Sequence, residues 1–79
     1  MEELRRRIDG IDDRILELLE SRVELAKKIG AVKRGEGLPV HNPEREEDIL
    51  ERLTAETKLE KDFVREIFES IITYCRENE

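Results

Sequence analysis

The first third of the sequence carries a long apolar stripe of helical period that a single arginine interrupts. Alternate steps of four and three residues select nine positions on one helix face, of which eight are aliphatic: Leu4, Ile8, Ile11, Ile15, Leu18, Arg22, Leu25, Ile29 and Val32. A guanidinium keeps its charge, and burying it without an anionic partner is energetically costly. Arg22 is therefore expected either to pair with a carboxylate of the protein or to bind an anionic ligand.

The length of this first helix predicts an oligomer. The chain has 79 residues, which indicates one domain spanning residues 1–79. A helix from about Glu2 to Arg34 is roughly 50 Å long, whereas a compact monomer of this size has a radius of gyration of roughly 12 Å. The rest of the chain is too short to cover the whole stripe, so we expect a second chain to cover it.

Charge and cysteine content exclude several classes of protein. The formal net charge of −6 argues against nucleic acid as a partner and makes any local convergence of cations more informative. Charged residues are abundant, but the apolar residues are periodic, which predicts a folded chain. The single cysteine, Cys75, excludes an internal disulfide and suits the reducing cytoplasm. The short apolar runs predict no membrane span and no signal peptide.

Two shorter helices are predicted after a loop over residues 35–41. The first helix is expected to end at Arg34 with Gly35 as its C-cap. Asn42 followed by Pro43 predicts the start of a second helix that runs to about Thr57. A third helix is expected from about Asp62 to the C-terminus, with these residues facing inward: Phe63, Val64, Ile67, Phe68, Ile71, Ile72 and Cys75. No strand pattern is present, so the fold class is all-α with three helices per chain.

The spacing of three cations predicts one positively charged pocket. Arg22 and Lys33 are eleven residues apart, about three helical turns, and so point nearly the same way along the first helix. Arg45 lies one turn before Ile49 on the apolar side of the second helix, with Glu46 beside it. These three cations are expected to converge between the two helices.

Arg5 requires a different arrangement. It lies beside the apolar stripe, 17 residues before Arg22, which is roughly 25 Å along the helix. Within one chain the two side chains cannot meet. In an antiparallel two-fold dimer, Arg5 of one chain reaches the middle of its partner's helix and completes the same pocket.

Five separated elements of the sequence share the spacing of a known family. They read Leu4-Arg5-x-x-Ile8-Asp9-x-Ile11-Asp12, Leu18-Leu19-x-x-Arg22-x-x-Leu25-Ala26, Ile29-Gly30-x-x-Lys33, Pro39-Val40 and Asn42-Pro43-Glu44-Arg45-Glu46. This pattern resembles the all-helical chorismate mutases (type II, prokaryotic), closely over about the first 53 residues and loosely thereafter. The resemblance implies an intertwined antiparallel helical homodimer. It also implies rearrangement of chorismate to prephenate in phenylalanine and tyrosine biosynthesis, without a metal or cofactor.

The resemblance also implies a role for each candidate cation. Arg22 and Arg45, with Arg5 from the partner chain, would hold the two carboxylates of the substrate, since guanidinium groups bind carboxylates in a bidentate manner. Lys33 would donate to the ether oxygen, where negative charge grows as the carbon–oxygen bond breaks. Arg22 and Lys33 are thus expected to be catalytic as well as substrate-binding.

Four further site residues follow from the same resemblance. Glu46 would accept a hydrogen bond from the ring hydroxyl, and Asn42 stands where the family often has aspartate. Cys75 stands where a small polar residue is common. Glu79, one turn later on the last helix, would donate to the ether oxygen. A glutamate there donates only when it is protonated, so we expect activity to fall with rising pH.

Two other functions use the same residues differently. A lyase that removes pyruvate from isochorismate would need a similar set of cations. A non-catalytic helical dimerisation or regulatory module would pair Arg22 internally, use Lys33 to stabilise a helix end and pair Arg45 with Asp48. A third arrangement that the resemblance allows combines both functions, with such a domain fused or bound to a neighbouring enzyme of the aromatic pathway. The discriminating observation is whether Arg22, Lys33 and Arg45 line one cavity without neutralising carboxylates.

Overall fold

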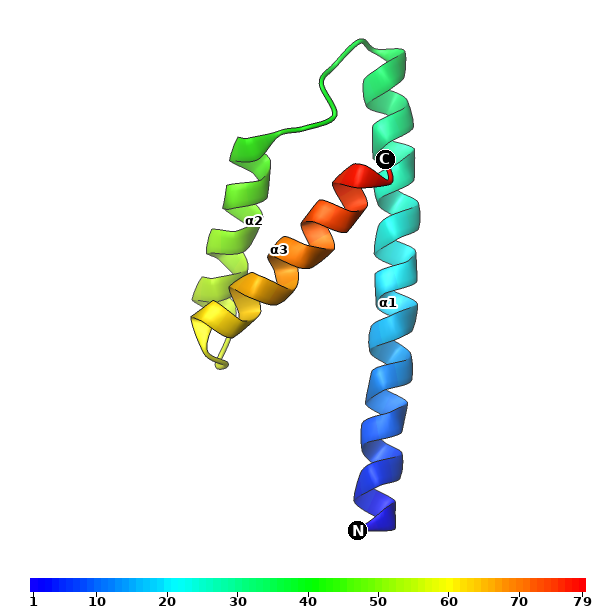
Figure 1. The fold of residues 1–79 in the computed structure, drawn as a ribbon, viewed down its shortest axis with the longest axis vertical. Helices are drawn as coiled ribbons and strands as arrows, with labels where there is room; N and C mark the ends of the chain where they lie inside the picture. The colour runs from blue at the N-terminus through cyan, green and yellow to red at the C-terminus, as the bar shows by residue number, and fades with distance from the viewer.

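The computed structural model describes residues 1–79 as three helices, which confirms the predicted all-α class. They are α1 (Glu2–Gly35), α2 (Pro43–Glu56) and α3 (Lys61–Glu77). In Figure 1, α1 is a long rod, a loop leads from its C-terminal end to α2, and α3 crosses back so that its C-terminal end meets α1. The N-terminal half of α1 stands free of the other two helices. None of the three helices is long and apolar enough to cross a membrane.

The end of α1 differs from the prediction. Gly35 belongs to the helix, and the glycine in the left-handed region is Gly37, with φ +71°. The N–H of Gly37 donates to the carbonyl of Arg34 at 3.2 Å, and the N–H of Leu38 donates to that of Lys33 at 2.8 Å. This pair of bonds is a Schellman closure, in which glycine avoids the Cβ clash of a left-handed residue. The prediction of Gly35 as C-cap was therefore wrong by two residues.

The boundaries of α2 follow the local signals, and those of α3 follow them less closely. The Asn42 side chain accepts a hydrogen bond from the backbone N–H of Arg45 at 3.2 Å, which confirms the predicted N-cap. Thr57 is extended and ends α2. The third helix begins at Lys61 and stops at Glu77, with Asn78 as its C-cap. The prediction that this helix reaches Glu79 was wrong.

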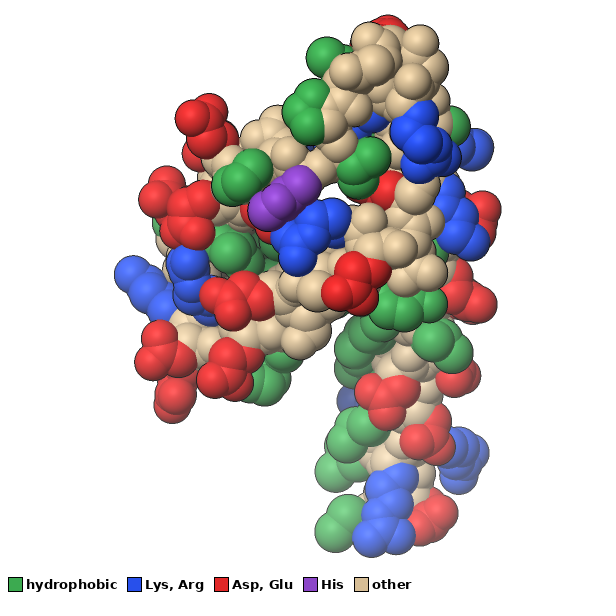
Figure 2. All heavy atoms as spheres, turned by 45° about the horizontal axis from the view of Figure 1, so that its top comes forward, with side chains coloured by type: hydrophobic (Ala, Val, Ile, Leu, Met, Phe, Trp, Pro, Cys, Tyr) green, Lys and Arg blue, Asp and Glu red, His purple; other side chains and the backbone are tan.

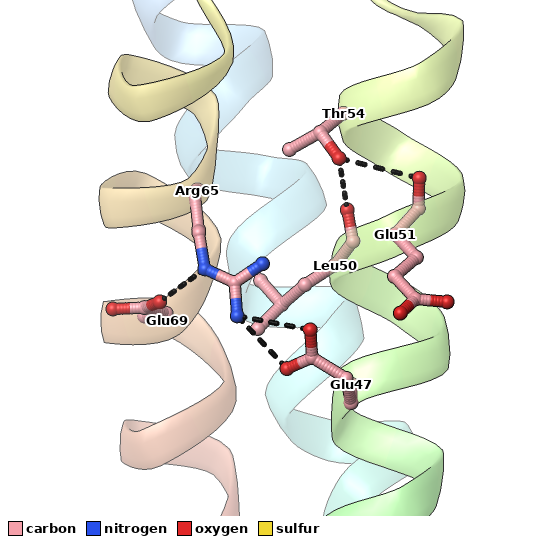
Figure 3. A network of polar contacts seen from close by, with 6 residues as sticks. All are labelled: Glu47, Leu50, Glu51, Thr54, Arg65 and Glu69. Carbon is pink, nitrogen blue, oxygen red and sulfur yellow. Dashed lines mark hydrogen bonds and ion pairs between the residues drawn. The ribbon is translucent and has the colours of Figure 1, made fainter.

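An arginine bridge holds α2 against α3 on their exposed side (Figure 3). Arg65 of α3 donates from Nη2 to both carboxylate oxygens of Glu47 of α2, at 2.8 and 3.0 Å, and from Nε to Glu69 at 2.9 Å. The hydrogen bond to Glu47 raises the pKa of Arg65 above its ordinary value. Because arginine is already fully protonated at any working pH, this shift does not change the charge of Arg65.

The single chain has a small core and an extended shape. Only six residues are buried: Ala26, Gly30, Leu50, Val64, Ile72 and Cys75. The α2 helix packs on α3 and α3 packs on α1, whereas α1 and α2 make no close backbone contact. The radius of gyration is 15.3 Å, against roughly 12 Å for a compact monomer of this length. One chain therefore cannot cover its own apolar surface.

The apolar stripe of α1 is the largest part of that uncovered surface. Figure 2 shows hydrophobic side chains along one side of the free half of α1, with acidic and basic ones elsewhere on the rod. Five of these side chains are each 50–59% exposed: Leu4, Ile8, Ile11, Ile15 and Leu18. Phe63 and Ile67, predicted to face inward, are 53% and 40% exposed. For the single chain that prediction was wrong, because the first turns of α3 diverge from α1 (Figure 1).

Candidate functional site

A pocket of about 450 Å³ opens between α1, the loop, α2 and the C-terminal part of α3. Because α1 and α2 make no close backbone contact, their facing side chains form two walls, and α3 supplies a third. The pocket lining includes seven of the eight predicted site residues: Arg22, Lys33, Asn42, Arg45, Glu46, Cys75 and Glu79. The apolar remainder of the wall includes Ala26 and Ile72.

Arg22 and Lys33 project into the pocket from α1, as their spacing predicted. Arg22 is half-buried and donates from Nη1 to the Sγ atom of Cys75 at 2.9 Å. Lys33 donates from Nζ to the backbone carbonyl of Val40 at 3.0 Å. Neither side chain forms an ion pair within the chain. Both cations thus have neutral partners and keep their full charge for an anionic ligand.

Arg45 and Glu46 enter the pocket from the first turn of α2. The Asn42 cap fixes the backbone of Arg45, and the guanidinium of Arg45 pairs with no carboxylate, including that of Asp48 three residues on. Glu46 has a half-buried side chain, 22% exposed, that faces α3. The first turn of α2 therefore supplies one free cation and one carboxylate.

The carboxylate of Glu46 is held by Arg76, a pocket residue that sequence reasoning missed. Arg76 of α3 donates from Nη1 to both oxygens of Glu46, at 2.7 and 2.9 Å. A sequence signal was available, because Arg76 follows Ile72 by four residues and so shares the apolar face of its helix. The same reasoning, a cation on an apolar face, had identified Arg22.

Glu79 reaches the pocket through a turn and not through a continuous helix. Arg34 donates to the backbone oxygen of Glu79. At Gly30 a Cβ would lie 2.7 Å from the Cβ of Glu79, so only glycine permits this close approach. The Oε2 atom of Glu79 is buried and has no hydrogen-bond partner. A buried carboxylate oxygen without a donor is unfavourable, which favours a ligand that donates a hydrogen bond to it.

Arg5 is the one predicted site residue that the pocket of a single chain does not contain. It lies in the free half of α1, where it pairs with Glu2 at 3.2 Å. Both side chains are largely exposed, so this ion pair contributes little to stability. Arg5 is thus free to exchange Glu2 for another anion.

The charges of the pocket favour an anionic ligand. Four lining side chains are cationic (Arg22, Lys33, Arg45 and Arg76) and two are carboxylates (Glu46 and Glu79), in a chain whose net charge is −6. A second pocket, of about 590 Å³, is lined by apolar residues with Glu20 and Glu24 and has no cation. No three His, Cys, Asp or Glu side chains lie close enough to hold a metal ion. The first pocket is therefore the candidate site.

Comparisons with known proteins agree with this choice. The sequence profile of the chorismate mutase type II family matches residues 4–79. The bifunctional chorismate mutase/prephenate dehydratase of Aquifex aeolicus is 51% identical over 53 residues, which cover 67% of this chain and 15% of that protein. The chorismate mutase of Methanocaldococcus jannaschii is 36% identical over 75 residues, covering 91% of this chain and 76% of that one.

Solved structures give the same result at the level of the fold. The chorismate mutase of Thermus thermophilus, in its form II structure, superposes with a TM-score of 0.92 at 33% identity, over 96% of this chain and 89% of that chain. Its form I structure gives a TM-score of 0.90 at 34% identity, over 94% and 95% of the two chains. The three-helix arrangement and the long first helix are thus features that this chain shares with solved relatives.

Proposed function

The chain belongs to the chorismate mutase type II family, and from this premise we propose that its pocket rearranges chorismate to prephenate. This reaction is a step of phenylalanine and tyrosine biosynthesis. The observation that carries the proposal is the convergence of Arg22, Lys33 and Arg45 in one cavity, none of them paired with a carboxylate. A dimerisation module without activity is expected to pair Arg22 with a carboxylate of the protein. The structure shows no such ion pair within the chain.

The rearrangement of a dicarboxylate within one molecule needs no nucleophile. The protein must hold the compact conformer of the substrate and stabilise the negative charge that grows on the ether oxygen. In the proposed arrangement Arg22 and Arg45 bind the two carboxylates. Lys33 exchanges its neutral acceptor, the Val40 carbonyl 3.0 Å away, for the ether oxygen. A charged acceptor makes the stronger hydrogen bond, so the exchange is favourable as charge develops.

Three neighbouring residues orient the substrate and the cations in this proposal. Glu46 accepts from the ring hydroxyl with a carboxylate that α3 already holds in place. The side-chain oxygen of Asn42 accepts a hydrogen bond from the backbone of α2. Its amide N–H groups are free to donate to the substrate. Cys75 accepts from Arg22 and thereby fixes the direction of the guanidinium.

The functional unit in this proposal is an antiparallel homodimer of 79-residue domains. The exposed stripe of α1 supports it, because covering a half-exposed aliphatic side chain contributes roughly 1 kcal/mol. Pairing two such stripes antiparallel carries Arg5 of each chain toward the partner's pocket, where it binds a substrate carboxylate. We also propose a cytoplasmic location, which suits the free thiol of Cys75 beside a substrate site.

The direct test is incubation of the purified protein with chorismate and identification of the product. We expect prephenate from the wild-type protein and almost none from Arg22→Ala, which removes a carboxylate-binding cation. Circular dichroism controls for the fold of the variant. A folded wild-type dimer that leaves chorismate unchanged would refute the proposal, and pyruvate released from isochorismate would favour the lyase.

The pH dependence of the reaction tests the role of Glu79. Its carboxyl group donates to the ether oxygen only in the protonated form, so we expect kcat to fall as pH rises and the group loses its proton. Glu79→Gln replaces it with an amide that donates at every pH, and should give a profile without that decline. Identical pH profiles for the wild type and the variant would exclude a protonated Glu79 as the donor to the ether oxygen.

A further inference from the structure

We infer that Arg76 is a positioning residue: it acts through Glu46, fixing and neutralising that carboxylate so that the pocket accepts a dianion. The inference rests on the proposed function, since it concerns how the same pocket binds chorismate. The family resemblance assigns roles to the other site residues but none to Arg76.

The geometry of the ion pair between Arg76 and Glu46 fixes the position of the Glu46 carboxylate. The Nη1 atom of Arg76 lies 2.7 Å from Oε1 and 2.9 Å from Oε2 of Glu46, so one donor holds both oxygens. The side chains of Arg76 and Glu46 are 30% and 22% exposed, respectively. Partial burial strengthens the attraction relative to an ion pair in open water. The pair spans α3 and α2 on the wall of the pocket, which fixes the carboxylate where a ring hydroxyl can reach it.

The negative charge of Glu46 has to be compensated before the pocket can bind a dianion. A lone carboxylate on the wall repels a ligand that carries two carboxylates. His41 is the other basic group near it, with Nε2 at 3.8 Å from Oε1, but that side chain is 56% exposed and is charged only when protonated. Arg22, Lys33 and Arg45 make no ion pair with Glu46 and are left for the ligand. Arg76 therefore compensates the negative charge of Glu46, and none of the ligand-binding cations is used for this purpose.

The chain contains a matched control for this role. Arg65 of α3 bridges to Glu47, the residue after Glu46, with one donor atom at 2.8 and 3.0 Å from the two oxygens (Figure 3). Arg65 and Glu47 both lie outside the pocket lining. The two bridges join the same two helices in the same way, and one of them faces the site. A role limited to holding α2 on α3 would be shared by both arginines.

The experiment compares Arg76→Gln with Arg65→Gln in steady-state kinetics with chorismate, after thermal unfolding has established that both variants fold. We expect Arg76→Gln to raise KM by about tenfold or more with a smaller change in kcat, because binding of the dianion is weakened in the ground state. Arg65→Gln should keep the wild-type KM. Equal changes in the two variants, or a wild-type KM in Arg76→Gln, would overturn the inference.

A double variant separates positioning from direct binding of the substrate. Glu46→Gln with Arg76→Gln removes the unpaired carboxylate, and glutamine still offers an oxygen to the ring hydroxyl. We expect its KM to lie below that of Arg76→Gln alone. A KM equal to or above that of the single variant would mean that Arg76 binds the substrate itself and would overturn the inference. Wild-type protein without chorismate mutase activity would refute the proposed function instead, before any variant is compared.

Discussion

Replacing Lys33 with alanine should lower kcat for chorismate by about 10²–10³-fold, the usual cost of removing one donor from a developing oxyanion. The proposed contact of Lys33 with the ether oxygen strengthens as the carbon–oxygen bond breaks, so its loss raises the barrier more than it weakens substrate binding. In the free protein the side chain makes one hydrogen bond, to the Val40 carbonyl, and no ion pair. The variant should therefore remain folded.

Lys27 provides the control for this experiment. It lies on the same helix, is about half exposed and pairs with Glu24 at 3.6 Å outside the pocket. Lys27→Ala should leave kcat unchanged, and both variants should unfold within a few degrees of the wild type. Near-wild-type turnover of Lys33→Ala would refute the role assigned to Lys33. A rise in KM at constant kcat would assign it to ground-state binding alone.

The directions of Arg22 and Lys33 were predictable because helix geometry converts spacing into direction. Eleven residues are close to three whole turns in any α-helix, whatever surrounds it. The N-cap at Asn42 was predictable for a similar reason, since the Asn-Pro start signal acts within one turn and places Arg45 on the pocket side. Helix geometry and capping were thus sufficient to predict that Arg22, Lys33 and Arg45 face one pocket.

The residues that sequence reasoning misplaced depend on tertiary contacts. Glu79 was expected on the last helix, but that helix ends at Glu77 and the following turn docks on Gly30 of α1, 49 residues away in the sequence. Arg76 acquires its role from Glu46 on another helix. The helical period places Arg76 on the apolar face of α3, but the partner in neither contact can be predicted locally, because both contacts depend on where α3 crosses α1 and α2. The exposed positions of Phe63 and Ile67 have the same origin.

The strongest test of the proposed dimer is the recovery of activity when two inactive variants are mixed. Arg5 lies far from Arg22 of its own chain, by roughly 25 Å along α1, so in the proposed dimer the pocket receives Arg5 from the partner chain. Arg5→Ala should lower kcat/KM by about 10²-fold, as expected for removing one partner of a buried charge pair. The fold should be unaffected, because the pair with Glu2 is exposed.

Arg5→Ala and Lys33→Ala refolded together in equal amounts should then regain about a quarter of the wild-type activity. Half of the dimers formed at random combine the two variants. In each of these, the pocket of the Arg5→Ala chain keeps its Lys33 and receives Arg5 from the partner, whereas the other pocket lacks both. If Arg5 served the pocket of its own chain, every pocket in the mixture would lack one cation and no activity would return. An Arg5→Ala variant as active as the wild type would remove Arg5 from the site altogether, so each arrangement gives a different measured rate.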